Sequence, residues 1–412
     1  MAMLLLANAR IVDGTADRPG DPVNVLVEGG TIREVGPKVA SAKAKVLDLG
    51  GRTLMPGLID CHVHVVAGLA DLGRNAALPD SLVMSRAIGI MQGMLMRGFT
   101  TVRDVGGADF GVKLAAEEGL LPMPRLVISG KALSQTGGHA DFRGRFDSRP
   151  PQETGPFPLG ALGRICDGVD AVRKASREEI KAGADFIKIM ANGGVASPTD
   201  PIHFFGFSRE EISAIVAEAA AAGTYVSAHL YTDEAIRRAV ECGVHSLEHC
   251  NLIGPETARL AAKAGAVAVP TLVTYEMLAR EGASLGFPAD SVAKIDTVRL
   301  AGLKSLEIMQ DAGLTMAYGS DLLGAMHRHQ SEEFVIRGRV LKPRDVIASA
   351  THIAARLCRM EGRIGTVAPG AHADLVVVEG NPLADLSLLT RQGRHMPVIL
   401  RGGAFVKRKA LN

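Results

Sequence analysis

The sequence predicts an α/β protein in which a (β/α)8 TIM barrel carries a small β-sandwich domain formed by both chain ends. Two observations lead to this fold class. The middle of the chain alternates strand-like runs with Ala- and Glu-rich segments of helical period, such as SREEISAIVAEAAAAG. Both ends consist instead of short β-rich runs separated by Gly-Gly and Asp-Gly turns. The length of 412 residues suits a barrel with an accessory domain.

The two chain ends share one sequence pattern of short β-rich runs and glycine turns. Residues 1–55 contain the runs LLLANARIVDG, VNVLVEGGTIREVG and KVLDLGGRTLMPG, and residues 361–412 contain RIGTVAPGAHADLVVVEGNP and PVILRGGAFVKR. Runs of this kind, bounded by glycine turns, are typical of short strands and hairpins. We therefore expect residues 1–55 and 361–412 to pack together as one β-sandwich.

Residues 56–360 are predicted to form the barrel. Eight candidate strands occur at 58–65, 100–105, 125–129, 185–190, 225–230, 246–250, 266–270 and 315–320. Alternating strands and helices in this number are what a (β/α)8 barrel requires. Three connections are unusually long, at 131–171, 191–207 and 274–290. They follow strands, so they would emerge at the C-terminal face of the barrel as lids or binding loops.

Composition limits the classes of function. Hydrophobic residues make up 47% of the chain and the formal net charge is +2, which allows a large core and gives no basic surface for nucleic acid. The cysteines number five, an odd count, and show no paired spacing. This argues against a disulfide framework and fits a reducing compartment. The opening MAMLLLANARIVDG is too short an apolar run for a signal peptide, and no run reaches the ~18 residues of a membrane span. We expect a cytoplasmic homo-oligomer that acts on a small molecule and contacts neither nucleic acid nor membrane.

Polar side chains stand at or near the ends of five predicted strands. Alternate residues of a strand point the same way, so the imidazoles of His62 and His64 can face one interior point. One such histidine is more often a hydrogen-bonded core residue, and one aspartate before a helix is more often an N-cap. The joint pattern on one face of the barrel favours a metal site instead. The candidate ligands are His62, His64, Lys188, His229, His249 and Asp321.

Lys188 is the most informative of these residues. It lies in the apolar run FIKIM, where a buried ammonium would be costly and would repel metals held by histidines. A lysine carbamate, formed with carbon dioxide, is an anion whose two oxygens can each bind one metal. The net charge of two Zn²⁺, a carbamate, Asp321 and a hydroxide is about +1. With an ammonium in place of the carbamate, the net charge would be about +3. The alternative is a lysine paired with an acid on a neighbouring strand.

These motifs resemble the amidohydrolase superfamily, through PGLIDCHVH, the strand-four lysine, the two later histidines and the GSD aspartate. A closer resemblance is to its branch of Xaa-Pro dipeptidases, Arg/Lys carboxypeptidases and ochratoxin-hydrolysing amidohydrolases, through RGFTTVRDVGG, SGKALSQTGGHADFR, IKIMANGGVASPTDP, AHLYT, SLEHCNLI and PTLVTYE. The resemblance implies two zinc ions, carboxylated Lys188 as a bridging ligand and a bridging hydroxide as nucleophile. Leu230 after His229 and the bulky segment 203–205 depart from such relatives, at positions that bear on the substrate and not on the reaction.

The predicted chemistry assigns roles to further residues. Metal coordination would make a hydroxide available near neutral pH, and Asp321 could take its proton as general base and pass it to the leaving nitrogen as general acid. Tyr231 follows His229 by two residues and could donate to the oxyanion, or be a rim aromatic under a loop.

Substrate contacts are predicted on the long connections. His139, in TGGHAD, is expected to contact the substrate carbonyl or a terminal carboxylate, the alternative being a hydrogen bond that orders the loop. Arg143 and Arg145 could add charge complementarity to a carboxylate, and Val195 is a further candidate contact.

The sequence therefore predicts a binuclear zinc hydrolase that cleaves the amide bond of small dipeptide-like substrates at a C-terminal proline or hydrophobic residue. The main alternative is an amidohydrolase that acts on ochratoxin-like N-acyl amino acids, because lid residues rather than metal ligands decide the substrate. A single-metal deaminase and a non-catalytic binding protein are further alternatives. Lys188 argues against the former, and the full ligand set argues against the latter.

Overall fold

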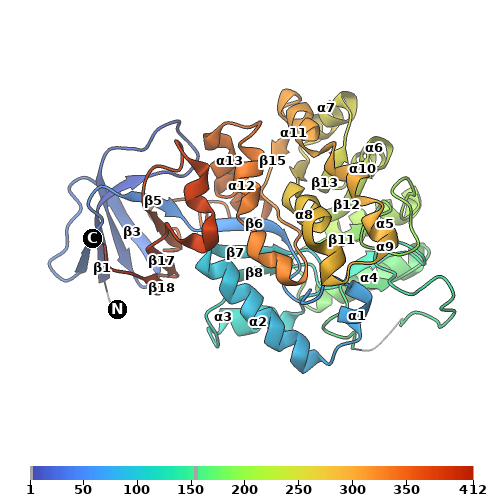
Figure 1. Ribbon diagram of the computed structural model, residues 1–412. Coiled ribbons are helices and arrows are strands. Elements are labelled where there is room, and N and C mark those ends of the chain that lie inside the picture. Colours follow the sequence, from blue (N-terminus) through green and yellow to red (C-terminus); the bar gives the residue numbers. More distant parts are fainter. Residues whose placement is uncertain (1–2, 153–155, 412) are drawn as a thin grey trace.

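The computed structural model describes residues 3–152 and 156–411 as an α/β protein with two regions. One region is rich in strands and carries both ends of the described chain, and the other holds the parallel strands and most of the helices (Figure 1). Residues 1–2 of the predicted first strand and 153–155 of the predicted first long connection lie outside the described residues.

The strand-rich region is an eight-stranded sheet with the order β18-β17-β16-β5-β1-β2-β3, in which β4 also pairs with β1. The antiparallel pairing of β16 with β5, in which Leu375 is opposite Pro56, joins the two chain ends. Leu6, Val25 and Val377 belong to a separate buried cluster in this region. The strands are β1 Met3–Ile11, β2 Val23–Glu28, β3 Thr31–Gly36, β4 Lys45–Asp48, β5 Thr53–Pro56, β16 Leu375–Val378, β17 Val398–Arg401 and β18 Ala404–Arg408.

The parallel strands form two sheets, with the orders β6-β7-β8 and β10-β9-β11-β12-β13-β14-β15. Each of the eight strands predicted for the middle of the chain is present in sequence order, although β15 is shorter than predicted. The residues after β15 run extended, since Ala317 N–H donates to the Ala268 carbonyl at 2.9 Å. The strands are β6 Leu58–Val63, β7 Phe99–Asp104, β8 Arg125–Ile128, β9 Ala132–Ser134, β10 Gly163–Ile165, β11 Ile187–Met190, β12 Val226–Thr232, β13 Ser246–Leu252, β14 Val267–Val269 and β15 Thr315–Met316.

Two of the long connections contain regular structure that the sequence analysis did not predict. Strands β9 and β10 lie within 131–171, and β9 pairs with β11 through Leu133 and Ile189. The connection at 274–290 is largely helical, because it continues α8 into two short helical turns, η1 and η2. Its apolar residues Tyr275, Met277 and Leu278 are buried against the main core, which favours a helix over an open loop.

Helices connect and surround the parallel strands (Figure 1). Helix α5 shows how the sequence sets their ends: Ser208 accepts from the Glu211 amide and the Glu211 carboxylate accepts from the Ser208 amide, which is a capping box. The helices are α1 Leu72–Ala76, α2 Asp80–Met96, α3 Phe110–Glu117, α4 Val169–Lys181, α5 Arg209–Ala221, α6 Asp233–Glu241, α7 Pro255–Lys263, α8 Leu272–Met277, η1 Leu278–Gly282, η2 Ala283–Leu285, α9 Ala289–Val292, α10 Ile295–Arg299, α11 Gly302–Asp311, η3 Gly324–His329, α12 Glu332–Arg337, α13 Pro343–Ser349, α14 His352–Leu357, η4 Leu386–Leu389 and η5 Arg391–Gly393.

The parallel strands are buried on both faces, as expected where helices cover a sheet. Every residue of β6 is buried, including its polar residues Asp60 and His62. A buried polar side chain must find a partner, so the polar residues of these strands mark the place to search for a site. Within residues 3–152 and 156–411, no helix has the length and apolar character that crossing a membrane requires.

Candidate metal centre

All six candidate metal ligands line one cavity of about 50 Å³. His62 and His64 come from β6 and the loop after it, and Lys188 comes from β11. The other three come from later in the chain. The cavity is lined by His62, His64, Leu72, His139, Phe142, Leu162, Lys188, Met190, Val195, Ala196, His229, Tyr231, His249, Thr274, Tyr275, Leu278, Asp321 and Leu323.

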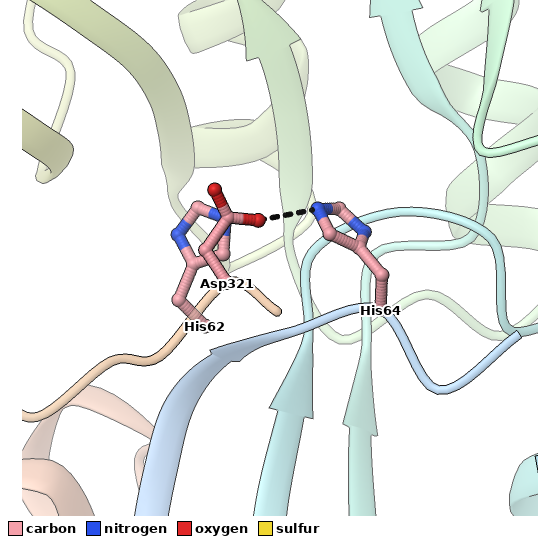
Figure 2. Close-up of side chains that lie close together, drawn as sticks. All are labelled: His62, His64 and Asp321. Carbon is pink, nitrogen blue, oxygen red and sulfur yellow. Dashed lines mark ion pairs between the residues drawn. The ribbon is translucent and has the colours of Figure 1, made fainter. Parts of the chain in front are cut away.

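His62, His64 and Asp321 form the tightest group of the cluster. Figure 2 shows the Asp321 carboxylate between the two imidazole rings. Asp321 Oδ1 lies 3.3 Å from His62 Nε2 and 3.3 Å from His64 Nε2. One ligand atom from each of the three residues lies within 4.8 Å of the others, which is close enough for all three to bind one ion.

The remaining ring nitrogens already have partners. His62 Nδ1 lies 2.7 Å from Glu248 Oε2, and His64 Nδ1 lies 2.8 Å from the Gly106 carbonyl oxygen. Histidines that ligate metals usually donate their other N–H to a carboxylate or carbonyl, which fixes the ring and its tautomer. Here those Nδ1 contacts leave both Nε2 atoms directed toward Asp321. The donor set and its orientation therefore fit a divalent metal.

His229 and His249 complete the histidine cluster. The ring centroid of His249 lies 4.7 Å from that of His229 and 4.8 Å from that of His62. Burial holds the pKa of both His229 and His249 well below the usual histidine range, so both rings are neutral, as metal ligands must be. His249 and Asp321 have φ angles of 73° and 53°, a left-handed backbone that is costly for residues other than glycine and concentrates at functional sites.

Lys188 is 1% exposed. Among the described residues, none forms a hydrogen bond or ion pair with its amine. Burial lowers the pKa of Lys188 to about 8, although the charges of Glu248 and Asp321 oppose the shift. A buried amine without a partner is costly as an ammonium, so burial makes the neutral, nucleophilic form of Lys188 easier to reach than that of an exposed lysine. The alternative of a lysine paired with an acid on a neighbouring strand does not occur in this structure.

Glu248 is the main member of the site that the sequence analysis missed. It is fully buried, contacts His62 and accepts at 2.7 Å from Arg103 and at 2.6 Å from both Ser227 and Ser246. The Arg103 guanidinium, with the other contacts, keeps the pKa of Glu248 well below its usual range despite burial. An acid in the middle of the apolar strand SLEHC, next to a candidate ligand, was the signal that could have identified it.

Asp60 was also missed. Its carboxylate accepts from the His62 amide at 3.0 Å and from the Ser320 hydroxyl at 2.6 Å, so it joins the end of β6 to the segment that carries Asp321. Asp60 stands two residues before His62 and four before His64. The alternation that selected the two histidines therefore places Asp60 on the same side of the strand.

His139 lies over the histidine cluster, where the sequence analysis expected a substrate contact. Its ring stacks on His229 with a centroid separation of 4.0 Å. Its Nδ1 lies 2.7 Å from the Ser197 hydroxyl, which in turn contacts Asp200. Lys294 donates to the Ser197 carbonyl at 2.7 Å and fixes this part of the connection at 191–207. His139 thus makes the loop-ordering hydrogen bond of the alternative interpretation and also lines the cavity.

Tyr231 and Val195 both line the same cavity. The Tyr231 ring packs 4.7 Å from His229, and its hydroxyl oxygen lies 2.9 Å from that of Tyr275. Burial raises the pKa of both tyrosines, so both hydroxyls stay protonated and can donate hydrogen bonds. Tyr275, on α8, is a second phenol at the site that the sequence analysis did not identify.

The arginine pair predicted to contact a carboxylate lies elsewhere. Arg143 binds Asp141 through two hydrogen bonds, of 2.8 and 2.6 Å, and donates to the Arg149 carbonyl. Arg145 is exposed. Neither residue lines the histidine cavity, so the expected contact of Arg143 and Arg145 with a substrate carboxylate stays a prediction. The two hydrogen bonds to Asp141, two residues away in the sequence, hold the Arg143 guanidinium outside the cavity.

Comparisons with known proteins show similarity to hydrolytic enzymes. The model of the Amidohydrolase family matches residues 53–404. Ochratoxinase from Aspergillus niger is 33% identical over 369 residues, which covers 86% of this chain and 75% of that protein. A crystal structure of an amidohydrolase is 53% identical with a TM-score of 0.97, covering 99% of this chain and all of that one. A prolidase in complex with N-methylphosphonate-L-proline is 49% identical, with the same TM-score and coverage.

Proposed function

This chain belongs to the amidohydrolase family and is a hydrolytic enzyme, and we propose that it cleaves the amide bond of small dipeptide-like substrates with two zinc ions. The leaving residue is the C-terminal one, a proline or another hydrophobic residue. The observation that carries the proposal is the 49% identity, over nearly the whole chain, to a prolidase whose structure holds a proline phosphonate.

The donor set supports two metal positions. His62 and His64, with Asp321 between them, suit one divalent ion, and Lys188, as a carbamate, would help to hold a second. The six ligands are then His62, His64, carboxylated Lys188, His229, His249 and Asp321. When bound, such metals supply an acidified water as nucleophile and polarise a substrate carbonyl.

The protein's own groups would handle the proton and the charge. Asp321 lies within reach of both β6 histidines, so its carboxylate can accept the proton of the attacking water and return it to the leaving nitrogen. Tyr231, held by Tyr275, would donate to the developing oxyanion. His139 would donate to the substrate from the opposite side, while Ser197 and Asp200 orient its ring. Val195 would contact the apolar part of the substrate.

We further propose that the two parallel sheets belong to one (β/α)8 barrel, with domain limits at residues 1–55, 56–360 and 361–412. In support, Cys61 N–H of β6 donates at 2.8 Å to the carbonyl of Tyr318, just after β15, so the first and last strands are neighbours. A cytoplasmic homo-oligomer stays a prediction that size measurement of the purified protein and localisation would test.

A hydrolysis screen tests the substrate. The purified enzyme with zinc is assayed on dipeptides that vary in the C-terminal residue, on their C-terminal amides and on N-acyl amino acids. We expect Xaa-Pro and hydrophobic dipeptides to be cleaved, and amidation to reduce kcat/KM about tenfold or more, because donors that meet the carboxylate lose their partner. Equal turnover of free and amidated dipeptides would contradict carboxylate recognition.

One alternative has specific support. The 33% identity to ochratoxinase favours N-acyl amino acids with an aromatic leaving residue as a second substrate class. Cleavage of these compounds with no cleavage of any dipeptide would replace the proposed function by this one. Both activities use the same metal centre, so elemental analysis is expected to find about two divalent ions per chain in either case.

A further inference from the structure

A second polar cavity lies at the opposite end of the parallel strands from the histidine cluster. Its volume is about 490 Å³. Arg125 begins β8, Asp185 lies two residues before β11 and Tyr225 directly precedes β12, and all three line it. The cavity therefore opens at the amino ends of strands whose carboxyl ends carry the metal ligands. Nothing in the proposed reaction uses this place.

The cavity carries more positive than negative charge. Four cationic and two acidic side chains line it, with a formal excess of two positive charges. One cation is neutralised, because the Lys113 amine contacts both Asp185 carboxylate oxygens at 2.7 and 2.9 Å. The other acid, Glu117, is exposed at the rim. The excess charge thus comes from arginines: Arg125, Arg359 and Arg363.

The three guanidinium groups keep free hydrogen-bond donors. Arg125 makes one contact of 3.3 Å with Asp374, and its buried Nε has no partner. Arg359 donates to the Gly223 carbonyl and lies 5.1 Å over the Tyr225 ring, with no carboxylate among the described residues paired to it. Over the part of the chain that the structure describes, Arg363 has no side-chain hydrogen bond or ion pair. The buried Nε of Arg125 is costly without a partner unless a ligand meets it. Arg359 and Arg363 are exposed, so their free N–H groups face solvent at the mouth of the cavity and can reach a ligand there.

We propose that this cavity binds a small ligand that carries a phosphate group. Planar guanidinium groups match phosphate oxygens through paired hydrogen bonds, and three of them suit a dianion better than a single carboxylate. The volume exceeds that of a phosphate ion and lies in the range of small-molecule sites, so the phosphate is the head of a larger organic molecule. The assignment does not depend on the proposed reaction.

The cavity wall also connects to the metal cluster through buried contacts. The Tyr225 hydroxyl lies 3.3 Å from Arg103 Nη1, Arg103 Nη2 donates to Glu248 at 2.7 Å, and Glu248 contacts His62 Nδ1. Phosphate can also bind metals, so the experiment must separate the two places.

Calorimetric titration of the zinc-loaded enzyme with inorganic phosphate tests the proposal. The variant Arg359→Gln/Arg363→Gln is compared with Arg356→Gln, which removes an exposed arginine of α14 that does not line the cavity. We expect phosphate affinity to fall on the order of tenfold per guanidinium in the double variant and to stay unchanged in the control. Hydrolysis and the thermal midpoint should be retained in both, which shows that the variants fold.

Two results would overturn the proposal. Equal phosphate affinity in the double variant and the wild type would mean that phosphate binds elsewhere, for instance at the metals. Tighter binding of malonate than of phosphate, with the same loss in the double variant, would show that the site selects carboxylates.

Discussion

Replacing Glu248 by glutamine removes one charge from the floor of the metal centre at almost constant volume. The Glu248 carboxylate contacts His62 Nδ1 and the Arg103 guanidinium, each at 2.7 Å, and both side chains of the Arg103–Glu248 pair are fully buried. A glutamine turned with its NH2 group toward His62 Nδ1 would favour the tautomer that carries its proton on Nε2. That tautomer cannot donate its Nε2 lone pair to a metal.

The structure sets the expected magnitudes. Breaking a buried ion pair by removing one partner costs about 3–5 kcal/mol. We expect the lower end, on the order of 3 kcal/mol, because the Cys61 carbonyl still accepts from Arg103 Nε at 2.6 Å. Loss of a carboxylate that orients a ligating histidine weakens metal binding about 10–100-fold. Glu248→Gln should therefore lose both stability and metal affinity.

Glu333→Gln is a matched control. Glu333 forms an equally buried pair with Arg337, at 2.8 Å, and contacts none of the candidate ligands. Urea unfolding of the metal-free proteins measures the stability loss, and competition with a chelator measures zinc affinity. Both variants should be destabilised, and only Glu248→Gln should bind zinc more weakly. Unchanged zinc affinity in Glu248→Gln, or an equal loss in Glu333→Gln, would refute the argument that Glu248 orients His62.

Two further predictions concern the site itself. Lys188→Ala should lose zinc and activity, and a short carboxylic acid in the medium should restore part of both by occupying the bridging position; a variant that keeps two ions and the full rate would exclude a bridging role. Asp321→Asn should keep the fold and lose about 10²–10⁴-fold in kcat, because an amide cannot transfer the proton. A loss below about tenfold, measured at saturating substrate, would mean that the proton takes another route.

The sequence selected candidate ligands that share one cavity because their positions follow from simple geometry. His62 and His64 alternate along one strand, and the carboxyl ends of parallel strands meet at one end of a sheet. Glu248 and His249 did not follow this rule. They are consecutive, so a regular strand would point them apart, yet both reach the cluster because the backbone is left-handed at His249 and Cys250. The residue types do not predict this left-handed backbone, because neither His249 nor Cys250 is glycine.

Loop residues were harder to place. Arg143 was expected at the site from its charge, but a salt bridge with its near neighbour Asp141 holds it outside the cavity. His139 was expected there too and does lie over His229. The difference depends on contacts with Ser197, Asp200 and other residues far away in the chain, which local sequence does not encode.

The sequence by itself determined the order of the eight parallel strands expected in the middle of the chain, the placement of chemistry-bearing residues at strand ends and the choice of an amidohydrolase. These depend on local periodicity and on residue type, which each segment carries independently of the rest. Only the tertiary structure decided that no acid among the described residues pairs with Lys188, that Glu248 links Arg103 to His62 and that arginines gather at the far end of the strands. Those facts depend on distances between segments far apart in the chain, and long-range packing alone sets them.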